Sequence, residues 1–544
     1  MVKKLIVGFF LLFALFFAIS CGESKSDFLG VVSTASPEAS KVGESILQKG
    51  GNAVDAAVAI SFALGVTEPA MSGLGGGTQV LLSLKNQAPI AINGTTLSPA
   101  GTPTTILDTL SYHRRSTIPS TVKVLGYIWK KYGSGNMSWS DLLQPAIILA
   151  EDGFKVGKFR VKIFEQYSDK LNASPHNTYF FMDENRSIPG VGKTLKQPQL
   201  AKTLKRLAAT GADDFYKGEI AAKISQDMEE NNGWITIEDL NNFPEPKELA
   251  PLEIEYNGYQ IYSQPPPCGG WPTLLLLKLL SNLDSNNEIS ENDIVEALYL
   301  GHKDRREKPV VNLSEYQQFT NTKLSDDYAK DLVLQAVNSY SLEQEEEENG
   351  ETTHFSVVDH DGNGIAVTSS INAYFGALAT SEELGFLYNT YMDDFIFEQP
   401  AHPFAVRPNA MAYSSMSPTI VRKDGEIVLV LGSPGSGRII SSVAQFTAKW
   451  IENHNIEELI KYPRIHVDGN TIYLENSADS AVITKELLDK YELEFEFKDE
   501  SLSITPGLNS YFGGIHAIAK ENGNWVGVAD PRRDGLPIIV REKD

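Results

Sequence analysis

A pair of threonines, Thr352 and Thr353, stands in the stretch GETTHFSVVDHDGNG (residues 350–364), at the end of the acidic run EQEEEENGE. A threonine hydroxyl is a poor nucleophile unless a base lies beside it, and an N-terminal threonine carries such a base in its own α-amine. Thr352 would become N-terminal if its hydroxyl attacked the carbonyl of Glu351 and water then hydrolysed the resulting ester. The same hydroxyl could next attack a substrate amide through an acyl-enzyme. The alternative is that Thr352 only begins a strand, as threonine commonly does.

A second stretch with catalytic potential is LGSPGSGRIISS (residues 431–442), where a Gly/Pro turn lies between an apolar strand and a helix. Backbone N–H groups in such a turn can face an oxyanion, helped by the N-terminus of the helix. An ordinary strand-to-helix loop has the same pattern. The glycines of SGLGGGTQVLLSL (residues 72–84) are not expected to bind phosphate, because they follow a predicted helix and precede a strand, the reverse of the required order.

Other catalytic and metal-binding motifs are not matched. In DHDGNG, Asp359, Asp361, Asn363 and Gly364 fit the opening of a calcium loop, but the twelfth position is Ser370 and strand formers flank the segment. A hairpin turn is expected there instead. The nine histidines show no HExxH spacing, and no GxSxG turn is present. No metal or organic cofactor is therefore expected.

The composition is that of a soluble globular protein, with 42% hydrophobic and 22% charged residues. A formal net charge of −23 argues against a nucleic-acid partner, which needs a concentrated basic surface. Only two cysteines are present, Cys21 and Cys268, so there is no disulfide framework.

The N-terminal stretch MVKKLIVGFFLLFALFFAISC has the basic start and the apolar run of a secretory signal. The apolar run, residues 5–20, is short for a membrane-spanning helix, which needs about 20 residues. The ending AISC resembles a bacterial lipobox, in which Cys21 would be lipidated and become the mature N-terminus. The alternative is an ordinary cleaved signal. We therefore expect a protein of the bacterial cell envelope, periplasmic or anchored to the outer membrane through lipid alone.

Three regions differ in their predicted secondary structure. Residues 28–100 are expected to form strand, helix, helix, turn and strand, with Ser36 as a helix N-cap. Residues 110–340 are mostly helical by their apolar spacing, although YNGYQIYSQPPP is predicted as one strand closed by prolines. From Thr352 onward, short strands with Asp-Gly turns alternate with helices, which favours sheets layered with helices. The acidic run before Thr352 is predicted to be an exposed linker.

The order of several blocks along the chain resembles the gamma-glutamyltransferase family of N-terminal-nucleophile hydrolases, also called gamma-glutamyl transpeptidases or glutathione hydrolases. The blocks are GGNAVDAAVA, SGLGGG, LLQPAIILAEDGF, PPPCGG, TTHFSVVDHDGN, YMDDF, SSMSPTIV, GSPGSGRII and DPRRDG. The resemblance implies an α+β protein with a four-layer αββα fold, and self-cleavage before Thr352. After the signal peptide of residues 1–21, the helix-rich large subunit would be residues 22–351 and the catalytic small subunit residues 352–544. The two subunits would remain associated.

The resemblance also implies catalytic roles for individual residues. Thr352 matches the nucleophile, and the bond from Glu351 to Thr352 matches the cleavage site. Ser370 matches a hydroxyl that hydrogen-bonds the nucleophile. Gly435 and Ser436 match the backbone oxyanion hole, with Ser436 standing where a second glycine is usual.

Substrate contacts are implied in the same way. Asn372 matches a substrate-binding asparagine, and Asp394 matches the acid that holds the substrate α-amine. Ser414 and Ser415 match hydroxyls that bind the α-carboxylate.

Two positions depart from the family pattern. The arginine that usually pairs with the glutamyl α-carboxylate falls on Thr95, and Tyr391 stands where a Gln or Glu helps to hold the α-amine. Losing a buried Arg–carboxylate contact could cost about 2 to 5 kcal/mol of binding, unless another cation such as Arg114 or Arg115 reaches the site. Recognition of a glutamyl group is therefore expected to be altered at both ends.

Three functions follow from these patterns. The first is a self-processed gamma-glutamyltransferase that cleaves gamma-glutamyl compounds such as glutathione and transfers the acyl group to water, an amino acid or a peptide. The second is an amidohydrolase or acylase with the same nucleophile and a non-glutamyl substrate, which the residues at positions 95 and 391 favour. The third is an envelope protein that keeps the fold without turnover.

Overall fold

The computed structural model describes residues 27–543, with the exception of residues 106–108, 183–185, 284–287, 308, 310–315, 336–349 and 398. The predicted signal, Cys21 and all but the last two residues of the predicted acidic linker lie outside the described residues. Among the described residues, no helix combines the length and the apolar character needed to cross a membrane.

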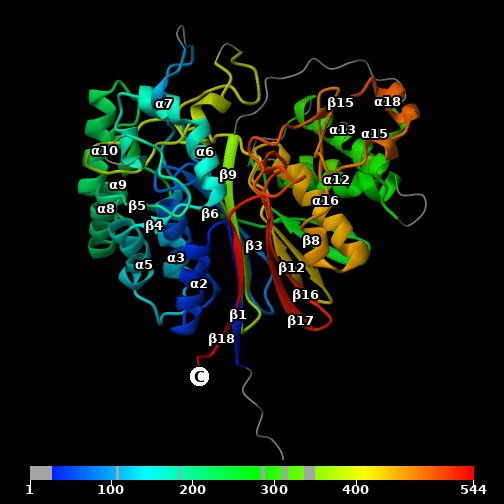
Figure 1. Ribbon diagram of the computed structural model, residues 1–544. Coiled ribbons are helices and arrows are strands. Elements are labelled where there is room, and N and C mark those ends of the chain that lie inside the picture. Colours follow the sequence, from blue (N-terminus) through cyan, green and yellow to red (C-terminus); the bar gives the residue numbers. More distant parts are fainter. Residues whose placement is uncertain are drawn as a thin grey trace, which may run out of the picture.

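Two β-sheets form the centre of the molecule (Figure 1). The first sheet has seven strands, in the spatial order β18 (Leu536–Arg541), β1 (Phe28–Thr34), β9 (Gly350–Asp359), β10 (Gly364–Ala373), β2 (Gly77–Ser83), β3 (Ile90–Asn93) and β6 (Lys247–Leu249). All neighbouring strands in it are antiparallel. The second sheet has six strands, in the order β17 (Asn524–Ala529), β16 (His516–Glu521), β12 (Glu426–Leu431), β11 (Thr419–Lys423), β8 (Tyr259–Ser263) and β7 (Leu252–Tyr256).

Helices cover the outer face of each sheet (Figure 1). On the first sheet lie α2 (Pro37–Gln48), α3 (Ala53–Thr67), α4 (Thr121–Tyr132), α5 (Trp139–Asp152), α6 (Lys158–Gln166), α7 (Ser168–Ala173), α8 (Pro198–Thr210), α9 (Asp214–Lys217), α10 (Glu219–Glu230) and α11 (Ile237–Asn241). On the second lie α12 (Gly270–Leu283), α13 (Glu291–Glu307), α14 (Tyr316–Lys323), α15 (Asp326–Gln335), α16 (Arg438–Asn453), α17 (Ile456–Leu459) and α18 (Lys485–Tyr491). Smaller sheets consist of β13 (Ile465–Asp468), β14 (Thr471–Leu474) and β15 (Glu494–Phe497), and of β4 (Phe154–Lys155) and β5 (Thr194–Leu195).

Apolar side chains of the two sheets meet in one buried cluster. Val31 and Val358 of the first sheet pack there with Ile420, Val430 and Ile518 of the second. Larger clusters lie between each sheet and its helices. Burial of a sheet on both faces is what produces four layers, so the predicted αββα architecture is confirmed.

The N-terminal helices follow the predicted local signals. Ser36 accepts a hydrogen bond from the backbone N–H of Ala39, with Pro37 in the first turn, as expected of an N-cap. Helix α3 begins with a capping box between Asn52 and Asp55 and is buried along almost its whole length, because it packs between the sheet and neighbouring helices.

Two β-hairpins test the secondary structure predicted for the segments DHDGNG and YNGYQIYSQPPP. The turn between β9 and β10 is the hairpin expected for DHDGNG, since Asp359 accepts hydrogen bonds from the backbone of Asp361 and Asn363. The segment YNGYQIYSQPPP contains the predicted strand as β8, which ends at Ser263 just before the prolines. The first residues of the segment form the turn of the β7–β8 hairpin, with Asn257 and Gly258 both at positive φ, the conformation that an Asn-Gly turn favours.

Candidate active site

A polar cleft of about 430 Å³ opens beside the start of β9. Eight of the residues singled out from the sequence line it: Thr352, Ser370, Asn372, Tyr391, Asp394, Ser414, Ser415 and Ser436. The other lining residues are Arg115, Gly350, Ala373, Asp393, Tyr413, Met416 and Ile439. Residues that lie far apart in the chain, from position 115 to position 439, thus line one cleft.

Thr352 stands at one end of a short hydrogen-bond chain that runs through Ser370. Its side chain is buried, and Oγ1 donates to Ser370 Oγ at 3.3 Å. Ser370 Oγ in turn donates to the carbonyl oxygen of Glu351 at 2.6 Å, and it accepts from the backbone N–H of Asn372 at 2.8 Å. The two hydroxyls therefore stand beside the peptide bond that joins Glu351 to Thr352.

A bulge in β10 positions Ser370. The pairing with β9 shifts register between Ser369 and Asn372, so Ser370 and Ile371 together oppose Thr352. An extra residue of this kind turns a side chain out of the regular alternation of the strand. Ser370 can thereby contact both the threonine hydroxyl and the preceding carbonyl.

Two neighbouring carboxylates occupy another part of the cleft wall. Asp394 Oδ1 accepts a hydrogen bond from Asn372 Nδ2 at 3.1 Å. Asp393 forms an ion pair with Arg115, whose Nε lies 3.0 and 3.2 Å from the two carboxylate oxygens. Burial raises the pKa of Asp393, while the Arg115 guanidinium lowers it. Of the described residues that line the cleft, Arg115 alone is a basic side chain.

The Ser414–Ser415 pair is held by a buried arginine from α13. Arg305 Nη2 donates to Ser415 Oγ at 2.7 Å, and its Nε contacts the hydroxyl of Tyr413. Tyr391 is buried on the same wall, and burial raises the pKa of its phenol against hydrogen bonds to Ser370 and Ser414. This wall is thus rich in hydroxyl groups.

The turn before α16 brings Ser436 to the cleft in a left-handed conformation. Ser436 has φ 52°, and Gly435 before it has φ 121°. A non-glycine residue in the left-handed region costs roughly 1–2 kcal/mol, which accounts for the preference for glycine at such a position. Ser436 nevertheless adopts this conformation. Its side chain lies directly against Gly350, because a Cβ added to Gly350 would come within 2.8 Å of Ser436 Oγ. Gly435 itself does not line the cleft but packs against Gly513.

Thr95 lies outside this cleft. Its hydroxyl donates to Asn93 Oδ1 at 2.6 Å and accepts from Gln79 Nε2 at 3.0 Å, and it lines a separate small pocket. The structure therefore does not bring the predicted substrate contact at position 95 to the nucleophile, because the polar network behind β3 engages that hydroxyl.

Three polar side chains of the cleft were not assigned a site role from the sequence: Arg115, Asp393 and Tyr413. Each stands next to a residue that was named, since Arg114 and Arg115 were considered together and Asp393 and Tyr413 precede Asp394 and Ser414. Their position next to predicted site residues was the signal in the sequence that could have identified them. Arg114 turns elsewhere, with its Nε on the carbonyl of Asn232.

The fold and the site define a class of protein. Two sheets between helical layers, with a threonine near the head of a central strand beside a polar cleft, constitute the fold of the N-terminal-nucleophile hydrolases. The crystal structure of cephalosporin acylase from Bacillus halodurans has the same fold, with a TM-score of 0.83 over 94% of this chain and 96% of that chain, at 23% identity.

Within that class, the chain belongs to the gamma-glutamyltranspeptidase family, whose family model matches residues 39–540. The chain is 37% identical over 476 residues to the glutathione hydrolase proenzyme of Escherichia coli strain K12, covering 80% of each protein. It is 33% identical over 565 residues to the glutathione hydrolase proenzyme of Bacillus subtilis strain 168, covering 94% of this chain and 92% of that protein. The family predicted from the sequence blocks is thereby confirmed.

Proposed function

We propose that the protein is a self-processing gamma-glutamyltransferase and glutathione hydrolase whose nucleophile is Thr352. The observation that carries the proposal is the chain of hydrogen bonds from Thr352 Oγ1 through Ser370 Oγ to the Glu351 carbonyl, on the wall of a polar cleft. A hydroxyl stands beside the peptide bond that precedes it, and a donor already holds the carbonyl oxygen of that bond.

Self-cleavage begins when Thr352 Oγ1 attacks the carbonyl carbon of Glu351. The C–N bond to Thr352 breaks as the acyl group moves to oxygen, and the hydroxyl proton goes to the departing amine. Water then hydrolyses the ester, leaving Glu351 with a carboxylate and Thr352 with a free hydroxyl and α-amine. Ser370 stabilises the negative charge that develops on the carbonyl oxygen, because it donates to that oxygen.

Turnover uses the new α-amine of Thr352. The amine accepts the hydroxyl proton as Oγ1 attacks the gamma-carbonyl of the substrate, and the leaving amine takes that proton. The oxyanion is assigned to the backbone N–H groups that match the family's oxyanion hole, those of Gly435 and Ser436, of which Ser436 lines the cleft and Gly435 directly precedes it in the chain. Water, or the amine of an acceptor amino acid or peptide, then attacks the acyl ester and frees Thr352.

Recognition of the glutamyl group is assigned to the two polar parts of the cleft. Asp394, supported by Asn372, binds the substrate ammonium, and the hydroxyls of Ser414 and Ser415 bind the α-carboxylate. Arg115 supplies the positive charge that the family usually places at the position of Thr95. It lines the same cleft as Thr352, whereas Thr95 does not.

A second candidate is an amidohydrolase or acylase with the same nucleophile and a non-glutamyl substrate. Two observations favour it. The buried Tyr391 brings an aromatic ring to the cleft, and Thr95 brings no cation to it. Comparing glutathione and a gamma-glutamyl anilide with an N-acyl anilide that lacks the α-amine and α-carboxylate separates the two candidates, since only the second would prefer the last substrate.

The deciding experiment is intact mass and N-terminal sequencing of the purified protein beside Thr352→Ala. We expect two chains that co-elute on size exclusion, the smaller one beginning TTHFSVVD, and a variant that stays whole. A folded wild-type protein that remains a single chain would refute self-processing and leave a binding or structural protein of the same fold.

For location, we propose the bacterial cell envelope, with Cys21 carrying the lipid. The lipobox-like AISC sequence supports the proposal. Growth with labelled palmitate tests it: the wild-type protein should carry the label, and Cys21→Ser should not. An unlabelled wild-type protein in the periplasm would indicate an ordinary cleaved signal instead.

A further inference from the structure

The residue before the nucleophile buries its charge. Glu351 is 3% exposed, although an acidic run immediately precedes it in the sequence. Its Oε2 lies 2.7 Å from Arg533 Nη2, and its Oε1 lies 3.8 Å from Arg438 Nη2. Burying a carboxylate without a partner costs free energy. The ion pair with Arg533 offsets that cost and so allows the Glu351 side chain to be buried.

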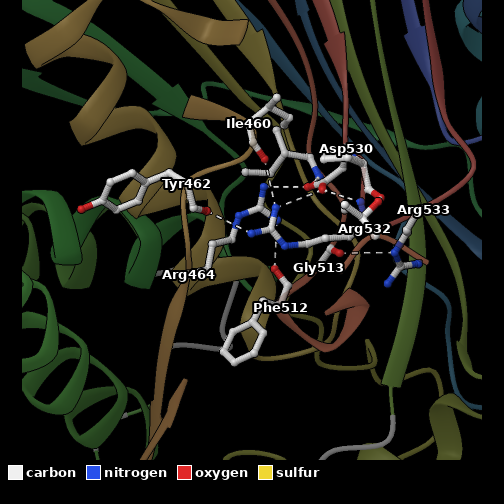
Figure 2. Close-up of polar contacts among 12 residues, drawn as sticks. Ile460, Tyr462, Arg464, Phe512, Gly513, Asp530, Arg532 and Arg533 are labelled. Atoms are coloured by element: carbon white, nitrogen blue, oxygen red, sulfur yellow. Dashed lines mark hydrogen bonds and ion pairs between the residues drawn. The ribbon is translucent and has the colours of Figure 1, made fainter. Parts of the chain in front are cut away.

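Arg533 is itself held in place from several sides. It is buried, and its Nε donates to the carbonyl of Gly513 at 3.4 Å (Figure 2). Its guanidinium lies over the ring of Phe159. The preceding residue, Arg532, forms buried ion pairs with Asp530 and Glu475.

These ion pairs belong to a larger buried network that Figure 2 shows around Arg532. Arg464 pairs with Asp530, and Arg532 also donates to the carbonyls of Ile460 and Tyr462. The burial of this network fixes the backbone at Arg532, and the next side chain, Arg533, extends from that fixed point toward β9. A rigid base of this kind allows one guanidinium to hold a partner in a narrow range of positions.

Glu351 is therefore held at two points. Arg533 holds its side-chain carboxylate, and Ser370 holds its main-chain carbonyl oxygen at 2.6 Å. The atom that Thr352 must attack lies between these two contacts. Small displacements of reacting atoms lower rates strongly, because only near-attack conformations react.

We propose that Arg533 is a positioning residue for self-cleavage: it anchors the Glu351 carboxylate and so keeps the Glu351 carbonyl beside Thr352 Oγ1. The inference rests on the self-cleavage given above as the proposed function. It adds no covalent step. The bond broken is still that between Glu351 and Thr352. The ion pair of Arg533 with Glu351 raises the fraction of time that the Glu351 carbonyl carbon lies within reach of the Thr352 hydroxyl.

The test is the rate of cleavage of newly made full-length chain in cell-free synthesis, followed by the appearance of the smaller chain. Glu351→Gln and Arg533→Met should each slow cleavage by about 10- to 100-fold. The double variant should be no slower than the slower single variant, because both changes remove one contact. Arg533→Lys, which keeps a positive charge, should recover part of the rate.

Two controls separate positioning from folding. Arg541→Met removes another C-terminal arginine, one that is exposed and paired with Asp27, and should cleave at the wild-type rate. In a Thr352→Ala background the single variants should unfold at lower temperatures than the parent, because each leaves a buried charge unpaired. The double variant removes both charges and should unfold close to the parent, so slow cleavage in the double variant reports positioning and not a folding defect. If Arg533→Met does not fold, Glu351→Gln, which changes only charge, decides.

The outcomes are distinct. Wild-type cleavage together with unchanged rates in Glu351→Gln and Arg533→Met would overturn the positioning role and leave the proposed function intact. Additive slowing in the double variant would also overturn it, because the two residues would then act separately. A folded wild-type chain that is never cleaved would overturn the proposed function and the inference together.

Discussion

Ser370 Oγ donates a 2.6 Å hydrogen bond to the carbonyl oxygen of Glu351, the residue whose peptide bond precedes Thr352. Ser370→Ala removes this donor, and we expect self-cleavage to slow by on the order of 100-fold, the usual cost of one lost oxyanion contact. Ser370→Thr retains a hydroxyl and should cleave at a rate close to wild type. Time courses of the small chain measure both. Equal rates for Ser370→Ala and wild type would show that the donor is dispensable.

Asp394 faces the cleft with Asn372 as its hydrogen-bond partner. Asp394→Asn removes the charge that would hold the substrate ammonium, and KM for a gamma-glutamyl anilide should rise by about 30-fold or more, equivalent to about 2 kcal/mol. Asp361→Asn, at the exposed β9–β10 turn, is the matched control and should change neither kcat nor KM. A lower kcat with an unchanged KM in Asp394→Asn would contradict a role in substrate binding.

Arg115 and Arg114 are neighbours in the chain, but only Arg115 lines the cleft. Arg115→Gln should raise KM for gamma-glutamyl substrates by about 10-fold or more, because a carboxylate loses a cation. Arg114→Gln should leave KM unchanged. A gamma-glutamyl amide whose α-carboxylate is esterified is the control substrate, and Arg115→Gln should bind it as the wild type does. Equal effects on both substrates would assign Arg115 to support of Asp393 instead.

Glu68 is a fully buried carboxyl that accepts a hydrogen bond from Thr353. Burial raises its pKa from 4.5 to about 7, against the lowering effects of Arg160 and Arg533. The folded state therefore keeps the proton at pH values where the unfolded chain has lost it. The free energy of unfolding should consequently fall as pH rises from about 4.5 to about 7 and then level off.

The side chain introduced by Glu68→Gln is uncharged at every pH, so this variant should not show the fall in the free energy of unfolding with rising pH. In a Thr352→Ala background, which keeps one chain, the variant should match its parent near pH 4. At pH 8 it should be more stable by on the order of 3 kcal/mol. Denaturant titrations across this range measure the difference. A stability difference that does not vary with pH would show that the pKa of Glu68 is the same in the folded and the unfolded protein.

Local signals predicted the elements better than the site. The N-cap at Ser36 and the turn at Asp359 depend on residues a few positions apart, so the pattern alone is sufficient. Strand β8 was likewise predicted from strand formers followed by prolines, whereas the Asn257–Gly258 turn before it was not predicted. Thr95 shows the opposite case: its place in an aligned block says nothing of the Asn93 and Gln79 groups that engage its hydroxyl.

Contacts between distant residues were out of reach of the sequence. Arg533 and Glu351 are 182 positions apart, and nothing in either neighbourhood indicates that they meet. Arg115 approaches the cleft because the sheet and its helices bring it beside Asp393, 278 positions away. Charged groups of this kind can pair with many partners, and the fold decides which ones.

The strand order of the seven-stranded sheet has a consequence for whether the protein can refold after it has unfolded. Strand β1 lies between β18 and β9, so a strand from the part before Thr352 is flanked on both sides by strands from the part after it. While the chain is whole, such a sheet assembles within one molecule. After a cut before Thr352, the same assembly requires two molecules to find each other. Refolding of the mature protein should then depend on its concentration, whereas that of Thr352→Ala should not, and the mature form would persist by the height of its unfolding barrier rather than by repeated refolding.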